Sequence, residues 1–150
     1  MDFLSQLLSN HMLVCAVISY MIAQILKVII NLLRERTLNL SLLLSSGGMP
    51  SSHSSTVAAL SISALRAYGP ASPYFAISFV LAAIVMYDAA GVRRAAGEQA
   101  KILNRILEDF MSGDPLLAEA SLKELIGHTP FQVFMGTVLG IAIALLLPLP

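Results

Sequence analysis

Residues 47–54 read Gly-Gly-Met-Pro-Ser-Ser-His-Ser and combine a histidine with several hydroxyls just before a run of small apolar residues. That composition is typical of the start of a helix. The first backbone N–H groups of a helix have no partner within it, and the helix dipole favours negative charge there. His53 adds a proton that can move near neutral pH. The segment predicts an anion site; the alternative is an ordinary helix start, with Ser51 or Ser52 as its cap and His53 as a bystander.

A second histidine, His128, stands before Thr129 and Pro130, a pair suited to a helix cap and a first-turn proline. Phosphoryl transfer needs little beyond positioning and neutralisation of charge, so two histidines at helix starts favour a phosphate site. The planar fork of arginine binds phosphate oxygens in pairs. The other ionisable side chains that we expect near this site are Lys27, Arg34, Asp88, Arg93, Arg94 and Glu98.

Each of these groups also has a purely structural interpretation. Lys27 could extend along its helix to the lipid head groups, and Arg34 could simply determine topology. Asp88 could form a structural ion pair with Arg93 or Arg94, and Glu98 could pair with Arg94 at helical spacing. His128 could be only a capping or interfacial residue.

The composition indicates which elements hold these residues. Of 150 residues, 57% are hydrophobic and only 12% are charged, whereas soluble domains carry about 25% charged residues. The chain is therefore expected to be a single membrane-embedded domain, residues 1–150. Zero net charge and the absence of tryptophan exclude a basic, base-stacking nucleic-acid surface. Cys15, the single cysteine, is expected to be a small buried apolar residue.

The apolar segments predict an all-α integral membrane bundle with about four spanning helices. A span needs about 20 mostly apolar residues, and residues 12–33 and 131–149 meet this need. Residues 54–68 and 73–90 are shorter, but their alanine, serine and glycine content suits close helix packing in a bilayer. The turn between them is marked by Gly69, Pro70 and Pro73.

Four spans place both termini on one side of the membrane and residues 34–50 and 91–127 on the other. Most basic residues fall on that second side and only Arg66 falls toward the first, so the site is expected to be cytoplasmic and both termini extracytoplasmic. Residues 97–110 have one apolar and one charged face, which predicts an amphipathic helix on the membrane surface or packed over the bundle. Residues 116–126 predict a second short helix, closed by Gly127.

These residues resemble the divergent branch of the type 2 phosphatidic acid phosphatase superfamily, membrane lipid phosphatases related to vanadium haloperoxidases. The superfamily motifs are Lys-x6-Arg-Pro, Pro-Ser-Gly-His and Ser-Arg-x5-His-x3-Asp. Lys27 and Arg34 have the first spacing, with Glu35 in place of proline. Residues 50–53 match the second motif with serine for glycine. The third motif is similar to residues 121–132, with Leu122 for arginine and Gln132 for aspartate.

The resemblance implies a mechanism without metal or cofactor. His128 would be the nucleophile that forms a phosphohistidine, and His53 would be the general acid that protonates the leaving alcohol. The phosphate would be held by Lys27, Arg34, Ser51, Ser52 and an arginine from the pair Arg93 and Arg94. The substrate would be a lipid phosphomonoester or diphosphate in the cell membrane, with phosphatidate, phosphatidylglycerol phosphate and prenyl phosphates all open.

The departures from the motifs fall where the mechanism is most demanding. Gln132 can orient His128 but supplies no negative charge, so Asp88 or Glu98 is a candidate for that role. Arg93 or Arg94 could replace the arginine missing at Leu122. Without these substitutions the protein would be a non-catalytic membrane protein that binds anionic lipid head groups. The superfamily core has six helices, so either the segment 91–127 completes the bundle or two chains pair.

Overall fold

The structure, a computed structural model, describes residues 2–44, 47–110 and 127–148, without the side chains of residues 93, 94 and 107–110. Across these residues it is all-helical and contains no strand, which confirms the predicted fold class at that level. Its elements are α1 (Phe3–Ser9), α2 (His11–Glu35), the 3-10 helix η1 (Leu40–Leu44), α3 (Ser52–Tyr68), α4 (Pro73–Ala90), α5 (Val92–Phe110) and α6 (Pro130–Leu146).

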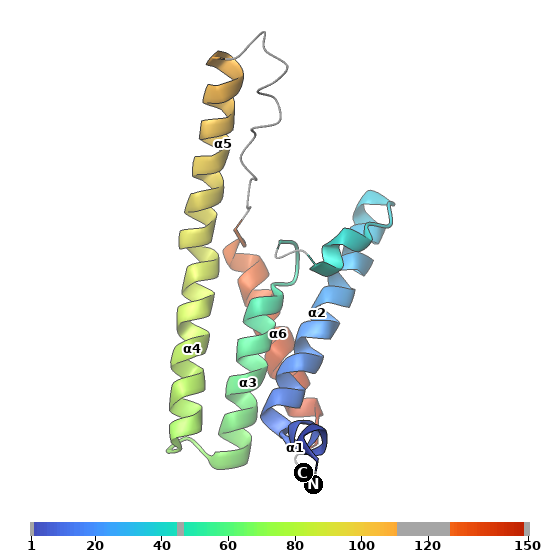
Figure 1. The fold of residues 1–150 in the computed structure, drawn as a ribbon, viewed down its shortest axis with the longest axis vertical. Coiled ribbons are helices and arrows are strands. Elements are labelled where there is room, and N and C mark those ends of the chain that lie inside the picture. The colour runs from blue at the N-terminus through green and yellow to red at the C-terminus, as the bar shows by residue number, and fades with distance from the viewer. Residues whose placement is uncertain (1, 45–46, 111–126, 149–150) are drawn as a thin grey trace.

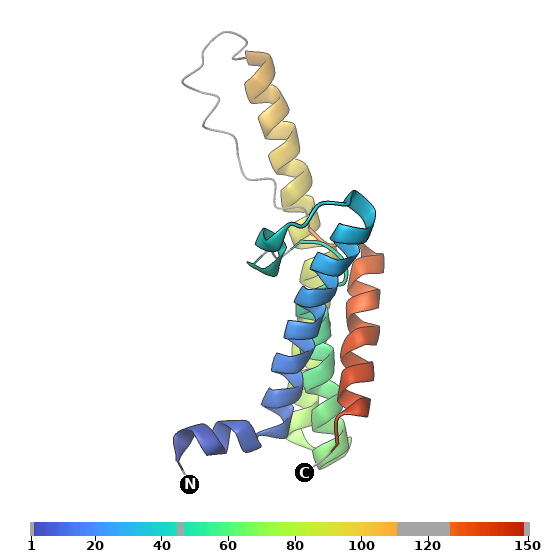
Figure 2. The ribbon, with the colours of Figure 1, turned by 90° about the vertical axis from the view of Figure 1, so that its right-hand side faces the viewer.

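Helices α2, α3, α4 and α6 run side by side with alternating direction, and α3 packs against the other three (Figures 1 and 2). At the upper end of this bundle in Figure 1, α2 and α4 end and α3 and α6 begin. Both chain termini lie at the opposite, lower end. The topology therefore brings two helix N-termini together at the upper end, where the first-turn N–H groups of each helix point outward.

Local capping explains where these helices begin. The side chains of Asn10, Ser51, Ser72 and Thr129 each accept a hydrogen bond from a first-turn backbone N–H, and so fix the starts of α2, α3, α4 and α6. Arg36 ends α2 in the left-handed conformation, with φ of 54°. The predicted segment 73–90 matches α4, and the predicted segments 12–33, 54–68 and 131–149 differ from α2, α3 and α6 by one to three residues at their ends.

Only part of the predicted set of spans has the length and hydropathy of a membrane-crossing helix. Within the described residues, α2 qualifies, and so does the long apolar stretch Pro73–Ile106 that begins with α4. Helix α6 is apolar but shorter, with 17 residues. Helix α3 also has 17 residues, and its several serines lower its hydropathy.

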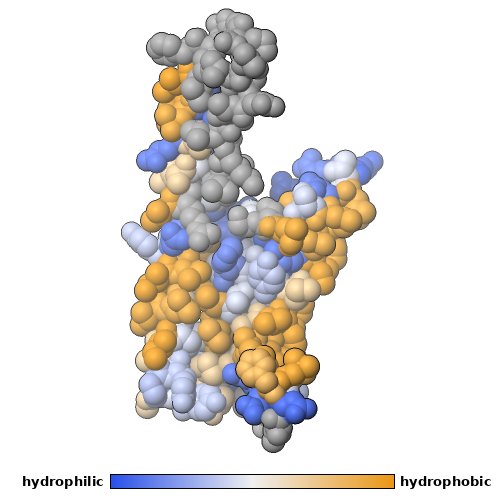
Figure 3. All heavy atoms as spheres, in the orientation of Figure 1, coloured by the Kyte–Doolittle hydropathy of each residue, from blue (hydrophilic) through white to orange (hydrophobic). Residues whose placement is uncertain are grey.

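The bundle has its small side chains inside and its large apolar side chains outside. Its most buried positions are alanine, cysteine, serine and glycine, for example Cys15, Ala59 and Ser63 at 0% exposure. Large residues such as Ile77 and Ile84 on α4 are more than half exposed. Figure 3 shows this apolar surface over α4 and α2. Small residues at helix contacts and bulky ones facing outward are expected when the surrounding solvent is lipid rather than water.

Three elements differ from the sequence-based prediction. Helix α1 and η1 were not expected, and α1 lies across the bundle axis (Figure 2). Residues 97–110 form a helix as predicted, but α5 extends beyond the bundle in line with α4 (Figures 1 and 2), so the alternative that it packs over the bundle is wrong. The physical reason lies at Gly91, where two helical bonds, Gly91 N–H to Tyr87 O and Ala95 N–H to Gly91 O, carry the direction of α4 into α5. The helix predicted at 116–126 lies outside the described residues.

Candidate functional site

Lys27 points into the bundle at its upper end. Its side chain is 2% exposed, and its Nζ donates to Ser52 Oγ at 3.0 Å. Gly48 lies over the aliphatic stem, because a Cβ built there would be 3.7 Å from Lys27 Cδ. The ammonium therefore does not extend to the head groups as the structural interpretation proposed. A buried cation is costly unless a partner or ligand offsets its charge, which makes Lys27 a functional candidate.

The start of α3 supplies the hydroxyls and one of the histidines. Ser51 Oγ accepts from the Ser54 backbone N–H at 3.3 Å and from the Ser54 hydroxyl at 3.0 Å. Ser51 is thus the cap, as one of the two interpretations predicted, and it is fully buried together with Ser52. His53 follows in the first helical turn and is half-buried. Ser52 remains the hydroxyl that touches Lys27.

The start of α6 lies directly against the start of α3. The Ser51 backbone N–H donates to Gln132 O at 3.1 Å. The approach depends on Gly136, where an added Cβ would collide with Ser51 O and lie 3.1 Å from Ser54 Cβ. The two positive helix ends therefore share one small region, and their dipoles add there.

Gln132 orients the ring of His128. Gln132 Oε1 accepts from the backbone N–H of Thr129 at 3.0 Å as part of a capping box, and because a backbone N–H can only donate, this atom is the amide oxygen. The same oxygen lies 3.3 Å from His128 Nδ1. Nδ1 is therefore the nitrogen that donates to Gln132, and in the neutral form of the ring the lone pair lies on Nε2. His128 is 5% exposed, so this ring is held in place within the bundle.

A last contact joins α4 to the same region. The backbone N–H of His128 donates to Ala89 O at 3.2 Å, and Asp88, the preceding residue of α4, is half-buried. A series of contacts thus links all four helices: Lys27 to Ser52, Ser51 to Gln132, Gln132 to His128, and His128 to Ala89. Figure 3 shows hydrophilic residues between α4 and α2 near the start of α3, with hydrophobic surface on both sides.

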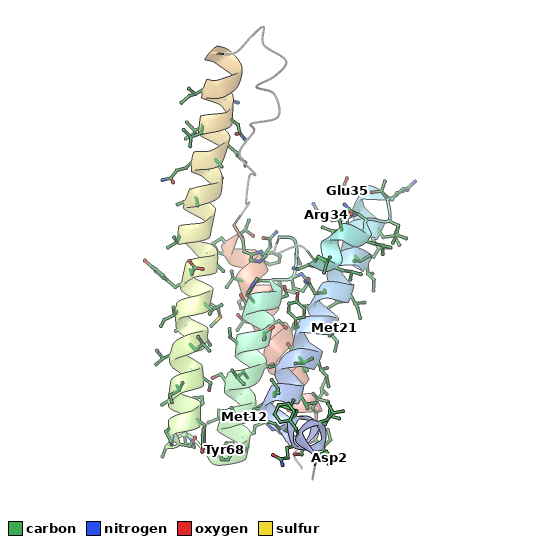
Figure 4. All side chains as sticks on the ribbon, in the orientation of Figure 1. Asp2, Met12, Met21, Arg34, Glu35 and Tyr68 are labelled. Atoms are coloured by element: carbon green, nitrogen blue, oxygen red, sulfur yellow. The ribbon has the colours of Figure 1, made fainter. Side chains whose placement is uncertain are left out.

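Some of the predicted site residues lie apart from this group. Arg34 is exposed at the upper end of α2 (Figure 4), roughly 10 Å along the helix axis from Lys27. No hydrogen bond or ion pair among the described residues joins it to Lys27 or Ser52. Glu98 is exposed on α5, and its Oε1 lies 4.0 Å from Lys101 Nζ, a pairing that the sequence interpretation did not include. The side chains of Arg93 and Arg94, and all of Leu122, lie outside the described residues.

The sequence interpretation missed a glutamine beside the lysine. Gln24 is 4% exposed, and its Nε2 donates to Tyr20 Oη at 2.9 Å and to Leu43 O of η1 at 3.0 Å. The signal was its spacing, since Gln24 and Lys27 are polar residues three apart in an otherwise apolar segment. Within the described part of the chain, no three His, Cys, Asp or Glu side chains cluster closely enough to hold a metal ion.

Comparison with known proteins shows the family of the chain. The model of the Divergent PAP2 family matches residues 8–143, which include every element of the site. The chain belongs to this family. It is also 43% identical, over 95% of its length and 96% of the relative's, to the uncharacterized membrane protein YuiD of Bacillus subtilis (strain 168). No solved structure matches the chain.

Membership of the Divergent PAP2 family confirms the resemblance that the motifs indicated. It places the chain among membrane proteins related to the phosphatase superfamily, in agreement with its outward-facing apolar surface.

Proposed function

We propose that the protein is a metal-independent membrane phosphatase that hydrolyses the phosphomonoester or diphosphate of a lipid. The observation that supports it most is the placement of His128, with Nδ1 directed at Gln132 Oε1, in one series of contacts with the buried Lys27. A nucleophilic imidazole needs its second nitrogen held by an acceptor, and Gln132 supplies that acceptor. Lys27 and the starts of α3 and α6 supply positive charge for the phosphate.

The substrate binds at two parts of the fold, its phosphate at the upper end of the bundle and its lipid chain along the apolar outer surface. The phosphate oxygens contact the Lys27 ammonium, the hydroxyls of Ser51 and Ser52, and the first-turn N–H groups of α3. Arg34 and the pair Arg93 and Arg94 belong to the segments bordering the upper end and complete the neutralisation of a dianion. The acyl or prenyl chain follows the exposed apolar side chains of α2 and α4 into the bilayer.

The chemistry proceeds in two displacements. His128 Nε2 attacks phosphorus while the ester P–O bond breaks, and the leaving oxygen takes the electron pair together with a proton from His53. Water then attacks the phosphohistidine, His53 accepts a proton from that water, and the N–P bond breaks to release inorganic phosphate. Asp88 precedes Ala89, whose carbonyl accepts from the His128 N–H, so Asp88 is the candidate for stabilising the charged ring of His128, with Glu98 as the alternative.

The membrane arrangement is part of the same proposal. Helices α2, α3, α4 and α6 of one domain cross the cell membrane, and α3 tolerates its serines because the other three helices surround it. The upper end, next to Arg34 and Arg36, faces the cytoplasm, and both termini face the other side. Pairing of two chains is one way to reach the six helices of the superfamily core.

Phosphate release by purified protein in detergent tests the proposal. The panel comprises phosphatidate, phosphatidylglycerol phosphate, and a prenyl phosphate and diphosphate. We expect release from at least one lipid, a loss of about 100-fold or more in His53→Ala, and in His128→Ala also the loss of a trapped acid-labile phosphoenzyme. Wild-type protein that releases no more phosphate than His128→Ala from every lipid would refute catalysis.

One observation favours a second candidate, a membrane protein that binds anionic head groups without turnover. Gln132 is neutral, so it orients His128 without stabilising a charged ring. This candidate predicts saturable binding of lipid phosphate that depends on Lys27 but not on the basicity of His128. A His128→Asn variant that binds as tightly as wild type, with neither protein releasing phosphate, would support it.

A further inference from the structure

Gln24 presents an amide whose orientation is determined by its neighbours. Its nitrogen faces the backbone carbonyl of Leu43 at 3.0 Å, and because a carbonyl can only accept, this atom must be the NH₂ group. The same nitrogen donates to Tyr20 Oη at 2.9 Å. The other end of the amide, Oε1, is therefore an acceptor held in a fixed direction.

This acceptor is buried without a donor. Gln24 is 96% buried, and Oε1 has no hydrogen-bond partner among the described residues. Buried side-chain acceptors are nearly always satisfied in folded proteins, because an unmade bond costs the full desolvation of the group. An orphaned and orientated acceptor indicates that a bound molecule supplies the donor.

The position of Gln24 indicates what that molecule is. Gln24 precedes Lys27 by three residues, a spacing that puts both side chains on the same face of α2. The segment that leaves α2 also covers both of them, since Leu43 O binds the amide of Gln24 and Gly48 lies over the stem of Lys27. The free acceptor thus neighbours the cation to which the proposed function assigns the phosphate.

We propose that Gln24 Oε1 accepts a hydrogen bond from a hydroxyl on the head group of the lipid phosphate, close to the phosphate itself. The site then selects lipid phosphates that carry a free hydroxyl next to the ester over those that lack one. The position of the phosphate rests on the proposed function, but the preference is a property of binding and does not require turnover. A site built to bond a hydroxyl discriminates strongly, because the analogue without it leaves the acceptor unpaired.

The test uses two lipids that differ by this one group. They are a long-chain alkyl phosphate and its analogue with a hydroxyl on the carbon next to the ester carbon, each titrated against full-length protein in detergent micelles. We expect wild type to bind the hydroxylated lipid about tenfold more tightly or better. In Gln24→Met, which keeps the side-chain volume, the ratio should fall to about twofold or less.

Ser63→Ala is the matched control, because Ser63 Oγ is also a buried atom with no partner among the described residues but lies eleven residues after Ser52 on α3. It should keep the wild-type ratio. Equal binding of the two lipids by wild type overturns the proposal even if Gln24→Met does not fold, and so does a ratio that Gln24→Met leaves unchanged. Phosphate release is measured in parallel: a preserved binding ratio with no release refutes the phosphatase and not the role of Gln24.

Discussion

The two ends of the α3–α6 pair each hold a cation, and they use it in opposite ways. At the lower end, the half-buried Arg66 of α3 donates to the carbonyls of Ala144 and Leu147, the second at 2.8 Å. These carbonyls belong to the end of α6, where the helix dipole is negative and acceptors lack intrahelical partners. The charge of Arg66 is therefore matched by the fold.

At the upper end the cation lies beside positive helix ends and not beside a negative one. Lys27 is buried beside the starts of α3 and α6, where the dipoles are positive, and its Nζ donates to the hydroxyl of Ser52. A cation next to positive helix ends destabilises the protein alone and stabilises a bound anion. The comparison indicates that the lower end is built for stability and the upper end for a ligand.

The strongest test of this contrast is Lys27→Met, which removes the charge and keeps the length of the side chain. We expect lipid phosphate release to fall by about 100-fold or more, because the substrate loses its buried counter-charge. Thermal stability should stay equal or rise, since the cost of burying an ammonium disappears. Retained activity together with lost stability would show that Lys27 stabilises the fold and does not bind the substrate. Circular dichroism melts and phosphate release, measured on the same detergent preparation, give both quantities.

The next test concerns the close approach of α3 and α6, using Gly136→Ala and Gly140→Ala. A Cβ at either position would collide with a backbone oxygen of α3, of Ser51 or of Ser55 respectively, so each variant should lose roughly 3 kcal/mol of stability. Only Gly136 touches the cap residue of the site, so Gly136→Ala should also lower the activity of the protein that remains folded. Equal activity in the two folded variants would show that the Ser51–Gln132 contact does not position the site.

Sequence reasoning could predict the features that depend on neighbouring residues. Apolar segments and capping residues gave the bounds of α4 and, within a few residues, those of α2, α3 and α6. Gln132 was predicted to orient His128, and its Oε1 lies 3.3 Å from His128 Nδ1, although His128 precedes the first residue of α6. Such features follow from the helical period and from turn chemistry.

Features that depend on distant segments could not be predicted in the same way. The contact of Ser51 with Gln132 joins residues far apart in sequence, and the bond from Gln24 to Leu43 needs the fold of η1, a single short turn. The direction of α5 depends on whether Gly91 bends the chain, and either outcome agrees with the same sequence pattern. The hydropathy of α3 likewise does not show that its serines are buried among the other helices.

A third test addresses the lower end through Arg66→Met. Removal of charged hydrogen bonds to Ala144 and Leu147 should cost about 2 kcal/mol of stability, measured by thermal or denaturant unfolding in detergent. Activity per folded molecule should stay within about twofold of wild type, a change of less than about 0.5 kcal/mol in the activation free energy. A loss of activity as large as that of Lys27→Met would mean that the two ends are not functionally separate.

The smallest expected effect comes from removing one helix cap at each end, with Thr129→Ala at the upper end and Ser72→Ala at the lower end. Each substitution removes one side-chain acceptor for a first-turn N–H and should cost about 1 kcal/mol. The acceptor lost at Thr129 is the one for the backbone N–H of Gln132, at 3.3 Å, so the turn that carries Gln132 toward His128 loosens, although the Thr129 backbone N–H still donates to Gln132 Oε1. Thr129→Ala should therefore lower phosphate release several-fold and broaden its pH profile, whereas Ser72→Ala changes stability alone. If both substitutions cost the same stability and neither changes release, the Thr129 hydroxyl is not needed to position Gln132 beside His128, and its cap serves stability alone, as that of Ser72 does.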